Sequence, residues 1–250
     1  MTDSVAILPA ILLLTLLASY MIGSIPFAYI IVRQVTGQDV SERGSGNVGA
    51  MNVRRSTGSW GWFLVAMISD ALKGFFPVTL AKLTAISLTA SFGSYFAPWA
   101  QHMDAISPGV SEGIAWTSLC LLTLPMLAVA GSVLGHNYSL WFGLIKRRFG
   151  RTGKGLATGG GALLAYDWRY FVLVVTVGLL TIALTRYMMA GQVAAAATLP
   201  VSALLLGSTD WVFALCMGAV VYAAHHKRFI GMLRGNEPRL YVNDDSGPRG

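Results

Sequence analysis

Long apolar stretches alternate with short polar ones along the whole chain. Seven stretches read as membrane-spanning helices, because about twenty apolar residues in a helix cross the hydrocarbon core of a bilayer. They cover residues 5–32, 58–83, 114–134, 156–166 (the shortest), 170–185, 190–206 and 211–224. Pro26 removes a helical hydrogen bond in the first of them, so we expect that helix to kink or end there. The pattern predicts an all-α polytopic membrane protein with about seven transmembrane helices.

The composition supports this prediction and excludes an ordinary soluble domain. Hydrophobic residues make up 54% of the 250 residues and charged residues only 12%, whereas a soluble domain carries about 25% charged residues. The formal net charge of +7 is typical of basic cytoplasmic loops near anionic headgroups. No stretch resembles a nucleic-acid motif. Cys120 and Cys216 lie in apolar stretches, so we expect them to pack there and to form no disulfide.

The basic residues predict the orientation. Fifteen of the eighteen Lys and Arg residues fall on one side of the membrane when four parts of the chain are placed together, namely residues 33–55, 146–154, 186 and those after 224. The positive-inside rule makes that side cytoplasmic, with the N-terminus outside and the C-terminus inside.

Two further segments are interpreted from their composition. Residues 84–113 contain no Lys or Arg, and we expect an outer loop there with an interfacial helix over residues 94–102. The N-terminus has no basic region before its apolar stretch and no clear cleavage site, so we expect the stretch from Ala6 onward to be retained as a span.

Residues 150–161 place two cations and six glycines between two apolar stretches. Glycine lets backbone N–H groups approach an anion closely, and Arg151 and Lys154 add positive charge. A helix that begins near Gly155 would direct its positive end to the same place. Close helix packing through glycines and a simple cytoplasmic basic loop are the alternatives, and both stay open. The stretch is not a Walker A loop, because a glycine follows Lys154.

A second polar stretch, residues 44–52 with the sequence GSGNVGAMN, precedes Arg54 and Arg55. Small residues, amides and two arginines can surround the oxygens of a phosphate or polyol. A flexible loop is the alternative. The regular spacing and the adjoining arginines favour a binding site.

Other ionisable residues lie inside or at the ends of apolar stretches. Asp70 and Lys73 are three residues apart on one helical face, and we expect a structural ion pair that positions the neighbouring loop rather than direct catalysis. His136 could orient a loop or shuttle a proton, but a lone histidine at a helix end is more often a structural hydrogen-bond partner. The cluster from His225 to Arg228 is typical of a patch that binds lipid headgroups. It could also supply cations to a phosphate site formed by the two glycine-rich stretches.

Metal and triad chemistry find no support in the sequence. The histidines are not grouped with cysteines or carboxylates at ligand spacing; they are His102, His136, His225 and His226. No Gly-x-Ser-x-Gly elbow occurs, so a Ser/His/Asp triad is not expected. We expect no metal and no cofactor.

Several motifs together resemble a known family. They are residues 45–52 (SGNVGAMN), Asp70-x-x-Lys73-Gly74, Gly135-His136, residues 153–158 (GKGLAT) and Gly235-x-Glu237, in that order. The chain resembles the bacterial acyl-phosphate:glycerol-3-phosphate acyltransferase family, PlsY. The likeness spans nearly the whole chain, and the combination is specific although each motif alone is not.

The resemblance implies one membrane domain over residues 1–250 in the bacterial inner membrane, with its active site facing the cytoplasm. The motif loops would be residues 33–57, 135–158 and 225–240. The implied reaction moves a fatty acyl group from acyl phosphate to the 1-hydroxyl of glycerol 3-phosphate and gives lysophosphatidate for phospholipid biosynthesis. The expected partners are these two substrates and membrane lipid, with no nucleic acid.

The resemblance also implies roles for single residues. Ser45, Arg55 and Lys154 match the residues that bind the phosphates, and His225 matches the histidine before the last motif. We expect His225, Lys154 and Ser45 to be catalytic. The expected substrate-binding residues are Ser45, Gly46, Asn47, Gly49, Asn52, Arg55, Gly153, Lys154, Gly155 and Arg228.

The sequence departs from the family pattern at several of these motifs. Met51 stands where the family has Thr, Met189 where it has Ser, Ser139 where it has Pro, and Arg228 where it has Asn. The basic loop has Gly150-Arg151-Thr152-Gly153-Lys154-Gly155 where the family usually has Lys-Gly-Gly-Lys-Gly. Three alternatives to the full activity therefore stay open: a different phospho-acceptor, a mainly lipid-binding role, and a small transporter.

Overall fold

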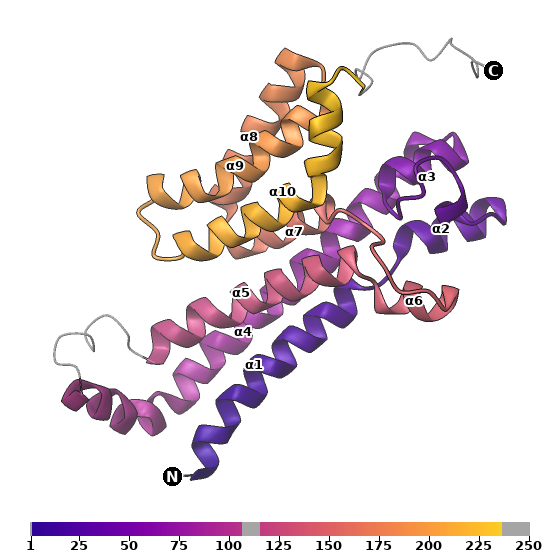
Figure 1. The fold of residues 1–250 in the computed structure, drawn as a ribbon. Coiled ribbons are helices and arrows are strands. Elements are labelled where there is room, and N and C mark those ends of the chain that lie inside the picture. Colours follow the sequence, from indigo (N-terminus) through magenta and orange to yellow (C-terminus); the bar gives the residue numbers. More distant parts are fainter. Residues whose placement is uncertain (1, 107–115, 237–250) are drawn as a thin grey trace, which may run out of the picture. The chain divides into compact units, whose positions relative to one another are not determined.

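The computed structural model describes residues 2–106 and 116–236 (Figure 1). Side chains are described for these residues except 2–8, 89–106, 116–120, 224, 227 and 228. Every regular element in these residues is helical, as the apolar pattern predicts. In chain order they are α1 (Thr2–Gly23), α2 (Phe27–Thr36), the 3-10 helix η1 (Val40–Glu42), α3 (Ala50–Thr57), α4 (Trp60–Ile106), α5 (Trp116–Asn137), α6 (Leu140–Lys146), α7 (Leu156–Tyr166), α8 (Trp168–Thr185), α9 (Met188–Leu205) and α10 (Trp211–Leu233). The chain divides into two compact units, Met1–Tyr166 and Asp167–Gly250, and each is described by itself.

Glycines hold the long helices of the first unit close together. α1 and α4 both pack against α5, and α4 also packs against α7 (Figure 1). A Cβ added at Gly23 would overlap the backbone of Ser132, and one added at Gly74 would overlap the carbonyl oxygen of Thr158. Gly161 fits equally tightly against the backbone of α4. Small residues let helix backbones approach closely, as is usual for helices inside a membrane. Within the glycine-rich stretch, close helix packing is thus observed at Gly161, whereas a Cβ at Gly159 would make an ordinary contact with Val133 at 3.8 Å.

The chain bends at the end of α1, where the sequence predicts a break. α1 ends at Gly23 and α2 begins at Phe27, on either side of Pro26, which cannot donate a helical hydrogen bond. After the break, α2, η1, α3 and α6 enclose a small apolar core that includes Ala28, Val32, Val40, Val53 and Phe142. This core fixes the short helices α2, α3 and α6 relative to the break.

α4 is longer than predicted. It runs as one helix from Trp60 to Ile106, so the prediction of an outer loop is wrong for residues 84–106, and the proposed interfacial helix is part of α4. Residues 84–92 contain no Gly, no Pro and no charge, so nothing in them ends the helix. The absence of Lys and Arg, which suggested the loop, does not determine backbone conformation. Residues 107–113 of the predicted loop lie outside the described residues.

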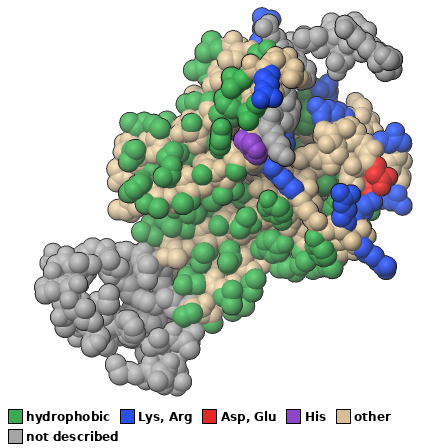
Figure 2. Space-filling view, viewed as in Figure 1, with side chains coloured by type: hydrophobic (Ala, Val, Ile, Leu, Met, Phe, Trp, Pro, Cys, Tyr) green, Lys and Arg blue, Asp and Glu red, His purple; other side chains and the backbone are tan. Residues whose placement is uncertain are grey.

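Four helical segments in the described residues are long and apolar enough to cross a membrane by length and composition: Pro9–Thr36, Trp60–Leu88, Trp168–Thr185 and Met188–Leu205. α7 and residues Trp211–Ala223 of α10 are shorter apolar helices. The faces that no other helix covers are largely apolar, with Leu14 64% exposed and Leu184 76% exposed (Figure 2). Such faces suit contact with lipid rather than water.

The second unit is formed by α8, α9 and α10, with α9 packed against both of the others. Gly191 of α9 lies against Gly178 of α8, again without room for a Cβ. The Tyr170 hydroxyl donates to the buried Asp210 carboxylate at 2.5 Å. α10 continues to Leu233, past the predicted end of the last span at residue 224; this extension contains Lys227, Arg228, Met232 and Leu233, which are good helix formers.

Candidate phosphate-binding site

Asn52 shapes the loop formed by the first motif. Its side-chain amide donates to the carbonyl oxygens of Val40 at 2.8 Å and Arg43 at 2.9 Å, and its Oδ1 accepts the Ser45 N–H at 3.2 Å. Gly44 has a φ of 52°, and a Cβ there would overlap this Oδ1, so glycine is required. Asn52 is only 2% exposed. We therefore assign it to holding the loop, whereas the sequence placed it among the residues that bind substrate.

The same loop leaves its phosphate-binding candidates accessible. Ser45 and Gly46 are exposed, and Asn47 and Gly49 are half-buried. Arg55 lies in the last turn of α3, is exposed, and carries its side chain past Gly44 at the base of the loop. A hydroxyl and a guanidinium group are thus available at the same loop for the oxygens of an anion.

Thr152 joins the first motif to the basic loop and to the end of α5. Its carbonyl oxygen accepts the Val48 N–H at 2.9 Å, and its own N–H donates to the Asn137 carbonyl oxygen at 2.8 Å. Its hydroxyl donates to the His136 carbonyl oxygen at 2.8 Å and accepts the Ser139 N–H at 3.2 Å. Four hydrogen bonds at one residue fix three separate segments relative to one another.

Lys154 lies in the turn that leads into α7. It is half-buried between Gly153, which is buried, and Gly155, which has a φ of 72°. α7 begins at Leu156, as the sequence predicts. The N-terminal end of α7, where the helix dipole is positive, therefore follows Lys154 directly in the chain. Since Thr152 attaches this turn to the first motif, the loops of Ser45 and Lys154 adjoin.

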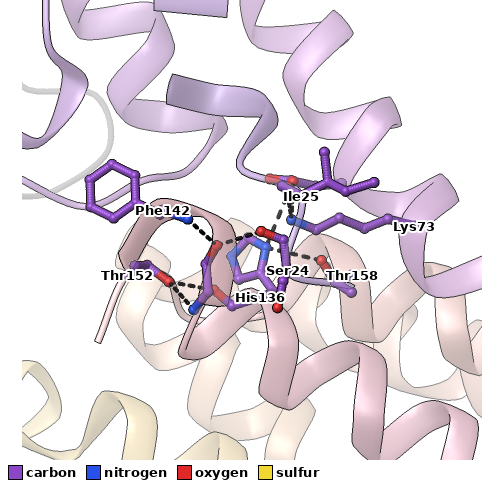
Figure 3. Close-up of polar contacts among 9 residues, drawn as sticks. Ser24, Ile25, Lys73, His136, Phe142, Thr152 and Thr158 are labelled. Atoms are coloured by element: carbon purple, nitrogen blue, oxygen red, sulfur yellow. Dashed lines mark hydrogen bonds and ion pairs between the residues drawn. The ribbon is translucent and has the colours of Figure 1, made fainter. Parts of the chain in front are cut away.

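Buried charges lie beneath these loops (Figure 3). Asp70 and Lys73 form the expected i, i+3 pair, with Lys73 Nζ 2.9 Å from Asp70 Oδ1. Lys73 also donates to the Ile25 carbonyl oxygen at 2.7 Å, next to the break between α1 and α2. His136 Nδ1 lies 3.7 Å from Asp70 Oδ1 and 3.1 Å from the Thr158 hydroxyl. The cluster connects α4, α5, α7 and the helix break.

Two serines connect the helix break to α6. The Ser139 hydroxyl donates to the Ser24 carbonyl oxygen and accepts the Phe142 N–H at 3.0 Å, so Ser139 caps α6. The Ser24 hydroxyl accepts the Leu140 N–H at 3.4 Å. A small pocket opens between the break, the loops and the buried charges. Its lining consists of Ser24, Ile25, Pro26, Phe27, Val48, Asp70, Lys73, His136, Ser139 and Thr152.

An ion-pair cluster attaches α6 to the loop after α2. Lys146 pairs with the carboxylates of Asp39 and, at 3.2 Å, Glu42. Burial favours a raised pKa for Asp39, but hydrogen bonds from Lys146 and Ser41 outweigh it and hold that pKa below its usual 3.8. The hydrogen bond to Asp39 raises the pKa of Lys146 above 10.5.

Exposed arginines surround this end of the first unit, where Figure 2 shows Lys and Arg side chains gathered over α2, α3 and α6. They are Arg33, Arg43, Arg55, Arg147, Arg148 and Arg151. Such a basic end attracts anionic substrates and headgroups.

The remaining predicted site residues belong to the second unit. His225 is buried in α10, and its ring Nδ1 donates to the Val221 carbonyl oxygen at 2.8 Å. Arg228 lies three residues further along the same helix. Met189, at the position of the expected serine, is 2% exposed. In the described part of the chain no group of three His, Cys, Asp or Glu side chains is placed to hold a metal ion.

From the sequence no role in the site was assigned to the hydroxyl residues that organise it. They are Ser24, Ser139, Thr152 and Thr158, all of them buried. Serine and threonine are common in membrane helices and loops, so their type alone carries no signal. The one available signal was that Ser139 and Thr152 both depart from the family pattern, in two different motifs.

Comparison with known proteins decides the family. A glycerol-3-phosphate acyltransferase family model matches residues 13–235. The chain belongs to the glycerol-3-phosphate acyltransferase family. It is 34% identical to a glycerol-3-phosphate acyltransferase of Synechococcus sp. (strain JA-3-3Ab) over 91% of this chain and 93% of the relative. It is 32% identical to the one of Gluconobacter oxydans (strain 621H) over 94% and 96%, respectively.

Solved structures agree with this family. The chain is similar to a crystal structure of PlsY (YgiH), an integral membrane glycerol 3-phosphate acyltransferase, in its glycerol 3-phosphate form. The identity is 27%, the TM-score is 0.67, and the match covers 91% of this chain and 94% of that one. A lysophosphatidic acid form of the same protein matches with a TM-score of 0.66. The family, the all-helical membrane fold and the enzyme class predicted from the sequence are confirmed.

Proposed function

We propose that this protein transfers a fatty acyl group from acyl phosphate to the 1-hydroxyl of glycerol 3-phosphate and so makes lysophosphatidate for phospholipid biosynthesis. The hydroxyl oxygen attacks the acyl carbonyl carbon, the bond from that carbon to the phosphate oxygen breaks, and inorganic phosphate leaves with the hydroxyl proton. Because acyl phosphate carries a good leaving group, the reaction depends on positioning and charge neutralisation more than on a covalent nucleophile.

The hydrogen bond of 2.9 Å between the Val48 N–H and the Thr152 carbonyl oxygen carries this proposal. It joins the segment that carries Ser45 and Arg55 to the segment that carries Lys154, so the segments that supply one hydroxyl and two cations adjoin at the basic end of the first unit. Two phosphorylated reactants need such a concentration of donors and positive charge.

We assign the phosphate groups to Ser45, Arg55 and Lys154. Backbone N–H groups of the glycine-rich loops assist them, at Gly46, Asn47, Gly49, Gly153 and Gly155. His225 is assigned to catalysis and Arg228 to substrate binding on the family resemblance.

We propose the membrane topology on the distribution of charge. Seven spans, an outer N-terminus and a cytoplasmic C-terminus place the basic end of the first unit at the inner leaflet of the bacterial inner membrane. The whole chain would then act as one integral-membrane domain. The cytoplasm would then be faced by the motif loops, which are residues 33–57, 135–158 and 225–240. Glycerol 3-phosphate is soluble there, and the phosphate end of acyl phosphate reaches the headgroup layer.

The test is an assay of the purified protein in lipid nanodiscs with acyl phosphate and several acceptors. We expect phosphate release and lysophosphatidate formation with glycerol 3-phosphate, and no turnover with glycerol, which lacks the phosphate. No turnover by folded protein would contradict the proposal. Faster turnover with another phosphorylated acceptor, such as dihydroxyacetone phosphate, would favour the alternative of a diverged acceptor. Equal use of an acyl thioester would contradict the assignment of the donor.

A further inference from the structure

Three residues that flank Lys154 contact one buried histidine. Thr152 donates its hydroxyl to the His136 carbonyl oxygen at 2.8 Å. Gly153 packs directly on the imidazole, where a Cβ would overlap Nε2. Thr158, in the first turn of α7, places its hydroxyl 3.1 Å from His136 Nδ1. The segment that carries Lys154 is therefore attached to His136 on both sides (Figure 3).

Charges from another helix hold His136 in turn. Asp70 Oδ1 lies 3.7 Å from His136 Nδ1 and 2.9 Å from Lys73 Nζ. Lys73 donates to the Ile25 carbonyl oxygen at 2.7 Å. The exposed fractions are 2% for Asp70, 4% for Lys73 and 7% for His136. The network thus runs without interruption from the helix break, through α4, to the residues around Lys154.

Packing alone does not account for such a network. A buried ion pair is often no more stable than apolar residues of the same volume, because both charges lose their hydration. Charged and hydrogen-bonded groups in the interior do select one orientation of the imidazole. That orientation fixes the position of Gly153 and so of the next residue. A displacement of about 1 Å in a positioning group can lower a rate by about a hundred-fold. Holding Lys154 in one position would therefore favour catalysis directly.

We propose that His136 is a positioning residue for phosphate binding. Asp70 and Thr158 orient its ring, and the ring holds residues 152–158 so that Lys154 meets the phosphate group of the substrate. The buried pair of Asp70 and Lys73 fixes the ring instead of taking part in the chemistry. This inference rests on the proposed function, because it requires Lys154 to bind phosphate.

Thr158→Val tests the proposal, since valine keeps the shape of threonine and removes only the hydroxyl that reaches His136. Thr79→Val in α4 is the matched control, because the Thr79 hydroxyl bonds within the described residues to the Phe75 carbonyl oxygen of its own helix, at 2.9 Å. We expect Thr158→Val to raise the KM of at least one phosphorylated substrate about ten-fold, as supporting residues around a site commonly do. A smaller effect on kcat is expected. Thr158→Ser should restore the wild-type KM, and Thr79→Val should leave it unchanged.

A second measurement does not depend on turnover. Lys154 is modified with an amine reagent, and inorganic phosphate is added as a protecting ligand, with the modified peptide quantified by mass spectrometry. Wild-type protein should be protected, and Thr158→Val should need about ten-fold more phosphate for the same protection. His136→Asn removes the ring beneath Gly153 and should show the same shift. It serves as the second variant in case Thr158→Val does not fold.

The outcomes separate the two proposals. Wild-type activity together with unchanged KM and protection in Thr158→Val would overturn the positioning role and leave the function intact. An equal rise of KM in Thr79→Val would overturn it too, because the effect would then be general. Wild-type protein with neither turnover nor phosphate protection would instead contradict the proposed function itself.

Discussion

Ser139 donates its backbone N–H to the hydroxyl oxygen of Thr152 at 3.2 Å, and both residues depart from the family pattern. The family resemblance implies proline at the first position and, when the shared Gly-Lys-Gly is aligned, glycine at the second. Proline has no N–H and glycine has no hydroxyl, so neither partner of this hydrogen bond exists there. In this chain both partners are present and each satisfies the other. Two departures in separate motifs are therefore one compensated change.

This pairing predicts a coupling between the two positions. Thr152→Gly leaves the Ser139 N–H without its acceptor, and we expect a loss of about 1–3 kcal/mol in the free energy of unfolding. Ser139→Pro removes that N–H but also the hydroxyl that caps α6. The double variant lacks both the N–H and its acceptor, so no unpaired group remains. It should therefore lose less stability than the sum of the two single variants. Thermal midpoints of the four proteins in detergent measure the coupling, and strict additivity would contradict it.

The close contact between α4 and α7 predicts which glycines tolerate a methyl group. Gly161→Ala and Gly74→Ala each place a Cβ on the backbone of the facing helix, so we expect a loss of about 1–3 kcal/mol or more from overpacking. Gly150→Ala is the control, because nothing lies within 4 Å of a Cβ there. Comparison of the yields and thermal midpoints checks this. Equal effects at Gly150 and Gly161 would show that the two helices do not pack as described.

The ion pair of Asp39 and Lys146 predicts a pH dependence of stability. The folded-state pKa of Asp39 is below 3.8, so its contribution is complete well above pH 3.8 and disappears as the pH falls through the folded-state value. Because the pKa of Lys146 is raised above 10.5, the ion pair loses its contribution to stability at the alkaline end only when the pH rises past that value. Asp39→Asn should therefore lower the thermal midpoint at neutral pH, and the difference from wild type should shrink in acid. A difference that stays constant from pH 7 to pH 3 would contradict this assignment.

The proposed topology predicts the accessibility of the basic loop. With Cys120 and Cys216 replaced by alanine, a single cysteine in place of the exposed Arg148 should react with a membrane-impermeant maleimide only after the inner membrane is opened. The matched probe replaces Ser4 and should react in intact spheroplasts with the outer face exposed. The reverse pattern would invert the orientation deduced from the positive-inside rule.

Much of the fold follows from local signals in the sequence. The apolar stretches locate the helices, and Pro26 ends one because it lacks a donor. Asp70 and Lys73 pair because a helix brings positions three apart onto one face. The extension of α4 past residue 84 was missed, because a shortage of cations indicates the side of a membrane and not the end of a helix.

The organisation of the site is less accessible from the sequence. The two glycine-rich stretches and their cations stand out by their chemistry among apolar residues, and the choice of Ser45, Arg55 and Lys154 within them rests on the family resemblance. The roles of Thr152 and Thr158 depend on which groups the packed helices bring close to them. No local sequence pattern contains that information. Asn52 shows the same limit, since an amide that can bind substrate can equally hold a loop.

The most direct test of the central claim compares Lys154→Ala with Arg148→Ala in the phosphate-release assay. Both variants remove one cation from the same loop, but only Lys154 lies in the turn that Thr152 attaches to the first motif. We predict that Lys154→Ala lowers kcat/KM by about a hundred-fold or more, as loss of a charge-stabilising group typically does, and that Arg148→Ala changes it less than about three-fold. Equal activity of the two variants would contradict the claim that the joined loops form the phosphate site.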